Sequence, residues 1–212
     1  MKQFRLVNCR SWSLVWALLA IPLGGSLRAD WALALGNELT QSAPEAELVS
    51  DGEQQAIAGL AITSPLPLKR ANQRLDDGLG ALEAEVRSQI SSYESWEAER
   101  DHGAWILVVN RITFVPGAQL DLDEAVNGTV EDITDGLEQA CQPQFSATPG
   151  MVAGLPGRRL SLRCDVPTGG PVYVEGVLFS QKTTLWQVQV AFQNPGQKAE
   201  AQKILQSVRV AN

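Results

Sequence analysis

Three cysteines carry the most distinctive chemistry of this chain. Cys9 lies near the start, whereas Cys141 and Cys164 lie in the second half. Two thiols form a disulfide where the compartment is oxidising and the geometry permits the bond. A Cys141–Cys164 bond would stabilise the fold by about 3 kcal/mol by closing the intervening loop. The alternative is a pair of buried free thiols that act as small hydrophobic side chains.

Few residues are suited to acid–base or metal chemistry. His102 is the single histidine, so any Ser–His–Asp or Cys–His scheme would have to use it. It follows Asp101 in an expected turn, where a solvated side chain is the ordinary outcome. Asp121, Asp123 and Glu124 lack the spacing of a calcium loop and suit the start of a helix better. We therefore expect no catalytic residue, no metal site, no cofactor and no enzymatic activity.

Three side chains are candidates for contacts with a partner. Trp96 has glutamates on either side, so it is the tryptophan with the best prospect of exposure. Arg159 and Arg163 fall on one face of an alternating strand and could meet an anionic group. The alternative for the arginines is a solvated sheet face with cross-strand ion pairs.

A glycine-rich stretch precedes that strand. Gly150, Gly154 and Gly157 could suggest a loop that cradles phosphate. Such a loop leads from a strand into the N-terminus of a helix, whereas this stretch leads into a strand at Leu160. We interpret the three as connection glycines.

The first 34 residues predict an export signal. They combine a basic start, an uncharged stretch from Ser11 to Leu27 with an apolar centre, and the small-x-small pattern Ala32-Leu33-Ala34. Cleavage could instead follow Ala29, or the segment could stay as a membrane anchor. The apolar centre is shorter than the about 20 residues of a spanning helix, which favours cleavage and no stable membrane span afterwards. The expected location is the periplasm, the exterior or a thylakoid lumen, and Cys9 would leave with the signal.

Signal removal makes the chain strongly acidic. Residues 1–29 contain four of the 17 basic residues and none of the 24 acidic ones, so the chain from Asp30 onward has 13 against 24, a net charge of −11. Nucleic acids and anionic lipids are bound through Lys and Arg. We therefore exclude nucleic acid as a partner.

The remaining length suits one domain, which we expect over residues 57–212. Residues 35–56 precede it, and within them the stretch from Gly36 to Gln55 is acidic, lacks basic residues and has few large apolar ones. We predict that this segment is a disordered linker.

The elements of the domain follow from hydrophobic periodicity. Apolar residues at steps of three and four predict helices, alternation predicts strands, and Asp121 and Asn194 are placed to cap helices. We expect strands over 57–63, 93–100, 104–115, 160–164, 172–179 and 186–192, and helices over 75–90, from 121 to Cys141, and from 195 onward. Both Cys141 and Cys164 would then point towards the core.

Consecutive strands with short turns predict an α+β fold: a mainly antiparallel sheet covered by about three helices, that is, an α/β/α sandwich. The segment Gly154-Leu155-Pro156-Gly157-Arg158-Arg159 and the ending Lys203-Ile204-Leu205-Gln206-Ser207-Val208-Arg209-Val210 resemble the PsbP-like, Mog-type family. That resemblance implies an accessory or binding protein, like the lumenal subunits of photosynthetic complexes and the small bacterial envelope proteins in this group.

Two functional hypotheses follow. The first is an exported, non-enzymatic accessory protein that contacts an envelope protein or membrane complex. The second is a periplasmic small-ligand-binding protein or a hydrolase whose site is assembled from scattered residues. A deep pocket with converging polar groups would favour the second hypothesis, and a closed core with a flat apolar patch would favour the first.

Overall fold

The computed structural model describes residues 52–71, 84–118, 120–137, 141–166 and 170–211. The expected signal at 1–34 and most of the expected linker lie outside these residues, as does most of the expected helix over 75–90. Its described end is the short helix α4 (Ala84–Gln89), and Ile90 already belongs to a strand. No helix within the described ranges is long and apolar enough to cross a membrane.

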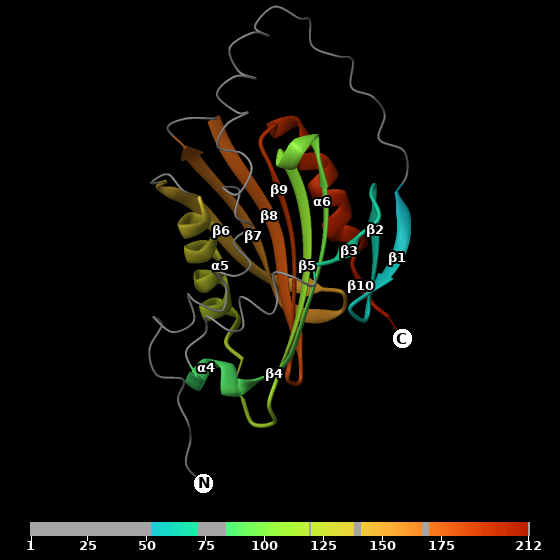
Figure 1. Ribbon diagram of the computed structural model, residues 1–212, viewed down its shortest axis with the longest axis vertical. Coiled ribbons are helices and arrows are strands. Elements are labelled where there is room, and N and C mark those ends of the chain that lie inside the picture. Colours follow the sequence, from blue (N-terminus) through green and yellow to red (C-terminus); the bar gives the residue numbers. More distant parts are fainter. Residues whose placement is uncertain (1–51, 72–83, 119, 138–140, 167–169, 212) are drawn as a thin grey trace, which may run out of the picture.

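An antiparallel sheet forms the centre of the molecule (Figure 1). Its spatial order is β3-β4-β5-β9-β8-β7-β6. The strands are β3 (Lys69–Arg70), β4 (Ile90–Arg100), β5 (Trp105–Phe114), β6 (Pro143–Val152), β7 (Leu155–Val166), β8 (Gly170–Gln181) and β9 (Thr184–Phe192). After β5 the chain crosses through helix α5 to the far edge, and β6 to β9 return as a meander. The expected α+β class with a mainly antiparallel sheet is confirmed.

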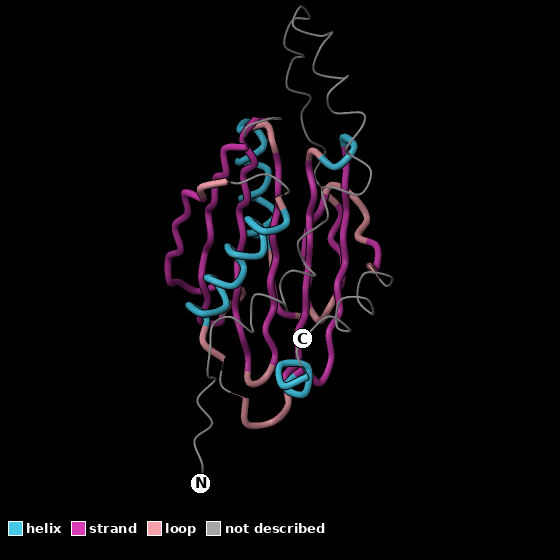
Figure 2. The backbone as a smooth tube through the Cα atoms, turned by 60° about the vertical axis from the view of Figure 1, so that its left-hand side comes forward, coloured by secondary structure: helices cyan, strands magenta, loops and turns pink. Residues whose placement is uncertain are grey.

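Strand alternation gives the sheet two apolar faces. In β9, Trp186 and Val188 belong to one hydrophobic cluster and Leu185 to the other. We call the first the α6 face, because helix α6 (Lys198–Ser207) packs there with a small sheet of β1 (Glu53–Ile57), β2 (Leu60–Ser64) and β10 (Arg209–Val210). The second is the α5 face, covered by α5 (Leu122–Gly136), which runs diagonally across the strands in Figure 2.

Both expected helix starts are confirmed. The Asp121 carboxylate accepts hydrogen bonds from the backbone N–H groups of Asp123 and Glu124, and the Asn194 side chain accepts one from Gly196. These bonds satisfy donors that a helix start leaves without an intrahelical partner. Asn194 caps a short 3-10 turn, η2 (Pro195–Gln197), which leads directly into α6.

The helical position predicted for Cys141 is wrong. The helix ends at Gly136, and Leu137 already has an extended backbone, with a ψ of 105°. Leu137 is nevertheless buried in the α5-face core. The apolar periodicity of the sequence therefore extends beyond the last helical residue, which made the helix look longer than it is. Cys141 lies in the segment just before β6.

The predicted boundary between linker and domain also needs correction. Residues 53–56, assigned to the linker, belong to β1, and the strand predicted over 57–63 is two strands joined at Ala58 and Gly59. Both turn residues have positive φ, at 58° and 75°, as a tight hairpin requires. The strand was missed because most of β1 is polar and little buried.

Strand β6 was not predicted at all. Gly154 is a connection glycine, with a φ of 82° in the β6–β7 turn. Gly150 and Gly157 are not: they face each other as a cross-strand pair in β6 and β7. Gly157 permits close packing, because a Cβ there would meet Leu178 O at 2.7 Å.

Candidate functional site

The most distinctive surface of the described residues is the outer edge of the sheet at β6, which we call the β6 edge. Among the described strands, β6 pairs only with β7. Nearly all its side chains are exposed, and Val152 alone is buried. Phe145 and Met151 are 47% and 61% exposed, and they are the exposed large apolar side chains of the described chain. An uncharged, exposed edge of this length is a surface on which another chain can pair.

The hairpin turn determines which backbone groups face outward. Ala153 and Gly154, both with positive φ, form a two-residue turn that makes Val152 and Leu155 a hydrogen-bonded pair. Hydrogen-bonded pairs recur at every second residue, so the even-numbered residues of β6 bond to β7. The odd-numbered residues therefore direct their N–H and C=O groups towards the free edge.

Both prolines of β6 occupy odd-numbered positions. Pro143 and Pro149 have no N–H, yet at these positions they remove no bond from the ladder with β7. Outward N–H groups remain at Phe145, Ala147 and Met151. The prolines thus leave Phe145 and Ala147 as a short donor-bearing window between them.

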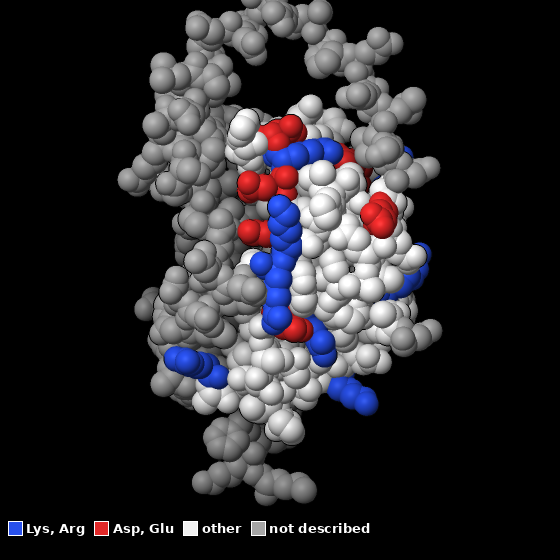
Figure 3. All heavy atoms as spheres, turned by 45° about the vertical axis from the view of Figure 1, so that its right-hand side comes forward, with Lys and Arg blue, Asp and Glu red and all other residues white. Residues whose placement is uncertain are grey.

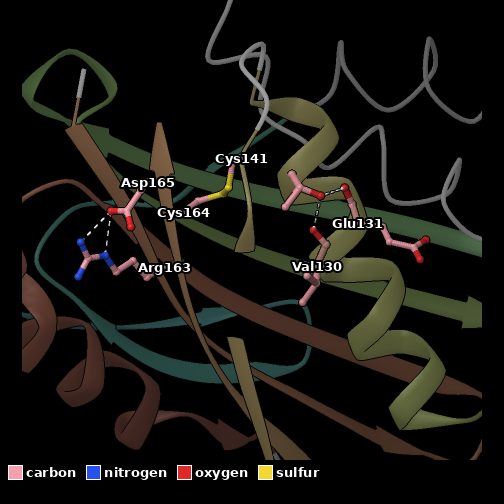
Figure 4. The surroundings of a disulfide bond; sticks show 7 residues. Val130, Glu131, Cys141, Arg163, Cys164 and Asp165 are labelled. Carbon is pink, nitrogen blue, oxygen red and sulfur yellow. Dashed lines mark hydrogen bonds and ion pairs between the residues drawn. A yellow bond between two sulfur atoms is a disulfide. The ribbon is translucent and has the colours of Figure 1, made fainter. Parts of the chain in front are cut away.

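The predicted disulfide is present and secures the start of the β6 edge. Cys141 and Cys164 are bonded, with a Cα–Cα distance of 5.7 Å. Cys164 is fully buried in the α5-face core, and Cys141 packs against that core from just before β6. Figure 4 shows the bond beside α5, with the Arg163–Asp165 ion pair next to it on β7. The sequence thus indicated the pairing of the two thiols, although it did not predict strand β6.

An ion pair ties the β6–β7 hairpin to the start of α5. The Arg158 guanidinium donates through Nη2 to Asp123 Oδ2 at 2.9 Å and through Nε to Asp123 Oδ1. This hydrogen bond lowers the pKa of the Asp123 carboxyl and raises the pKa of Arg158. Asp123 and Asp121 thus belong to helix capping and hairpin attachment, and no group of three His, Cys, Asp or Glu within the described ranges could hold a metal ion.

Arg159 and Arg163 lie on the α6 face of β7, as their alternation predicted, and both are exposed. Arg163 donates to Asp165 at 2.8 Å and lies 5.8 Å from the centre of the Tyr173 ring. The Arg159 guanidinium instead donates to the backbone oxygen of Met151 at 3.4 Å. Within the described part of the chain Arg159 has no ion pair. The two arginines are therefore not equivalent.

Acidic and basic side chains alternate elsewhere on the α6 side of the molecule. Figure 3 shows Lys and Arg side chains in a column with Asp and Glu beside them. Lys198 contacts Glu175 at 3.0 Å, and Arg100 pairs with Glu200. Glu175 also accepts a hydrogen bond from Ser161 at 2.7 Å. These pairs link α6 to the sheet.

Trp96 and His102 lie far along the fold from the β6 edge, on or next to β4. Trp96 is half-buried against the α6-face core, under the Arg70 guanidinium at 5.9 Å, so it offers less free ring than the sequence suggested. His102 is exposed in the short turn η1 (Asp101–Gly103), with a φ of 53°. The structure brings neither residue to Arg159 and Arg163.

A chain of internal polar side chains was missed by the sequence reasoning. Tyr93 Oη donates to Asn110 at 3.2 Å, Asn110 Nδ2 to Gln187 at 3.1 Å, and Gln187 Nε2 to Thr129 at 3.2 Å. The last three are buried, and burial raises the pKa of Tyr93. This series of hydrogen bonds links β4, β5, β9 and α5. Buried polar networks whose hydrogen bonds are satisfied help to specify how such elements pack. Alternation along β9 did not reveal that Gln187 is buried.

Comparison with known proteins supports the architecture. No protein-family model matches this chain, and no curated protein matches its sequence. Among solved structures, it is similar to the cyanobacterial PsbP protein, CyanoP, of Synechocystis sp. PCC 6803, with 10% identity, a TM-score of 0.51, and coverage of 80% of this chain and 98% of that one.

A second match is LpqN of Mycobacterium tuberculosis, described as involved in cell envelope biogenesis, with 8% identity, a TM-score of 0.39, and coverage of 76% of this chain and 86% of that one. The similarity to CyanoP concerns the fold alone. The expected PsbP-like architecture is confirmed.

Proposed function

We propose that this protein is an exported, non-enzymatic accessory protein that binds another protein of the cell envelope, alone or within a membrane complex, through the β6 edge. The proposal includes an α/β/α sandwich as the domain and a signal at residues 1–34 that is cleaved. It draws on the export pattern of the sequence and the accessory role that the family resemblance implies.

One observation carries the binding site. The β6 edge places Phe145 and Met151 in solvent on a strand with a free outer side, whereas the other large apolar side chains of the described chain are buried or half-buried. Exposed apolar side chains at a free strand edge are costly to keep in a monomer and mark contact surfaces. A disulfide and the Arg158–Asp123 pair hold the hairpin in place, so the surface is preorganised.

Photocrosslinking in cells tests this function. A photoreactive amino acid replaces Met151 in the full chain, and a matched variant carries it at Lys203, an exposed position on α6. We expect a discrete crosslinked product from position 151 and none from position 203. Monomer alone from position 151 would overturn the proposal.

Export is tested separately. The N-terminus of the protein recovered from the envelope fraction is sequenced, and we expect it to begin after Ala34 or Ala29. Recovery of the uncleaved chain from the cytoplasmic fraction would overturn the exported location while leaving the crosslinking result to judge the binding site.

A further inference from the structure

We propose that the β6 edge takes up an extended segment of its partner as an added antiparallel strand, with apolar side chains on the α5 face and a carboxylate that pairs with Arg159 on the α6 face. This inference rests on the proposed function and specifies the partner's chemistry and its mode of binding.

The backbone of β6 supports strand addition over a short window. Phe145 and Ala147 direct both N–H and C=O outward, so a segment opposite them forms two hydrogen-bonded residue pairs. Pro143 and Pro149 lack an outward N–H at the two ends of this window. They limit pairing to a few residues and discourage open-ended sheet growth.

On the α5 face, the side chains along the window alternate between large and small. Phe145 is large and exposed, Ala147 is small and half-buried, and Pro149 follows. A partner side chain above Ala147 can therefore lie between Phe145 and Pro149. Cross-strand neighbours on one face of a sheet contact each other directly, so apolar partner residues would cover Phe145.

On the α6 face, Arg159 supplies the charge. Its guanidinium crosses β6 and reaches the Met151 backbone oxygen, which faces the free edge. A Cβ at Gly150 would meet nothing within 4 Å, so this part of the α6 face has space for a side chain of an added strand. Because Arg159 has no ion pair with a described residue, a carboxylate on the added strand would give it a charge-assisted partner. Arg163 is already paired with Asp165.

A second copy of this chain is a poorer occupant. Strand β6 has no acidic residue, and its α6 face presents Gln144, Ser146, Thr148 and Gly150. Pairing of two β6 strands would leave both Arg159 side chains without a carboxylate from the added strand. The chain from Asp30 onward also has a net charge of −11, so two copies repel each other.

The test uses the full chain with the photoreactive residue at position 151. Ala147→Pro removes an outward N–H without touching the ladder to β7, and Pro at such positions already occurs in this strand. We expect it to reduce the crosslinked product roughly tenfold, while the matched control Ala147→Ser stays within about twofold of the parent. Circular dichroism and thermal melting show whether each variant is folded.

Substitutions of Arg159 provide a second test, which does not depend on whether the proline variant folds. Arg159→Glu should reduce the product more than Arg159→Gln, because a like charge repels the partner carboxylate whereas an amide only loses the attraction. Loss of product with Arg159→Glu should be accompanied by recovery when the partner's contacting carboxylate, located by mass spectrometry of the crosslink, is replaced by Lys.

The possible outcomes distinguish failure of strand addition from failure of the proposed function, which is protein binding at the β6 edge. A crosslink that survives Ala147→Pro at full yield overturns strand addition, although protein binding at this edge then stands. Equal effects of Arg159→Glu and Arg159→Gln overturn the carboxylate. A product that contains two copies of this chain and nothing else overturns the partner assignment, and the absence of any product overturns the proposed function itself.

Discussion

The two edges of the large sheet differ in how well they are protected from pairing with another chain. At one edge, β3 is only two residues long, and both are basic and exposed. Arg70 there lies over Trp96 and contacts Glu94 at 3.5 Å. At the other edge, β6 has ten residues, no charge, two prolines and exposed Phe145 and Met151.

The difference shows which edge is available for binding. Short, charged strands resist pairing with another chain, because adding a strand would desolvate the charges. Prolines at outward positions interrupt pairing only where they stand. The β3 edge is thus closed by charge, whereas the β6 edge keeps a window between its prolines. The disulfide and the Arg158–Asp123 ion pair attach the β6–β7 hairpin to the rest of the fold and so hold that window in a fixed position.

The largest expected effect comes from removing the covalent attachment of the β6 edge. Reduction of the Cys141–Cys164 bond should lower the free energy of unfolding by about 3 kcal/mol, because the unfolded chain gains the entropy of an open loop. Urea unfolding with and without reductant measures it. The variant Cys141→Ala/Cys164→Ala is the control and should not respond to reductant, and an unchanged midpoint in the reduced parent would contradict the prediction.

The second prediction compares the edge strand with its inner neighbour. Gly157→Ala on β7 should destabilise by about 1–3 kcal/mol, because the new methyl would meet Leu178 O at 2.7 Å and Val152 Cγ2 at 2.9 Å. Its cross-strand partner carries the matched change: Gly150→Ala points into open space and should be neutral or slightly stabilising. Chemical denaturation ranks the two variants, and equal losses would show that the edge is packed as tightly as the inner strand.

At the β3 edge the expected effect is smaller. Arg70→Ala removes a cation–π contact with Trp96 and an exposed ion pair with Glu94, which together contribute about 1 kcal/mol or less. Lys69→Ala on the same strand is the control and should cost less. Melting temperatures at low and high salt measure both. If Arg70→Ala lowers the melting temperature equally at low and high salt, the Arg70 side chain stabilises the fold by packing its stem on Trp96, which would contradict an ionic contribution.

The smallest effect concerns the attachment of the β6–β7 hairpin to α5. Arg158 lowers the pKa of Asp123 in the folded state, so the stabilisation is present above the pKa of the unfolded chain, about 3.9, and is lost as the pH falls through the lower folded pKa. Asp123→Asn should therefore melt below the parent at pH 7, and the two curves should converge as the pH falls below about 4. A difference that persists in acid would rule out the ionic contribution.

The predictions from sequence succeeded where a structural feature depends on residues close together in the chain. Trp186 and Val188 on alternating positions showed the orientation of β9, and Asp121 and Asn194 marked their helix starts through bonds to N–H groups two or three residues away. The predictions failed at β1 and β6. Both are edge strands with little burial, so neither displays the apolar alternation that identifies a strand.

The candidate site was predicted only in fragments. The placement of Arg159 on one polar face of β7 followed from alternation, but its reach to the Met151 oxygen depends on a strand that was interpreted as a connection. Phe145 and Met151 could not have been chosen, since their exposure follows from the position of β6 at the end of the sheet.

By itself the sequence determined the predicted export signal, the charge, the main strands and helix starts, and the two cysteines that pair. The signal, the charge, the strands and the helix starts depend on composition, on periodicity or on contacts within a few residues. The cysteine pair follows from the two thiols that remain after residues 1–34. The tertiary structure alone decided which strand lies at each edge, how Arg158 meets Asp123, and how Tyr93, Asn110, Gln187 and Thr129 join into one chain. Such contacts join residues far apart along the chain, and only strand order and register bring them together.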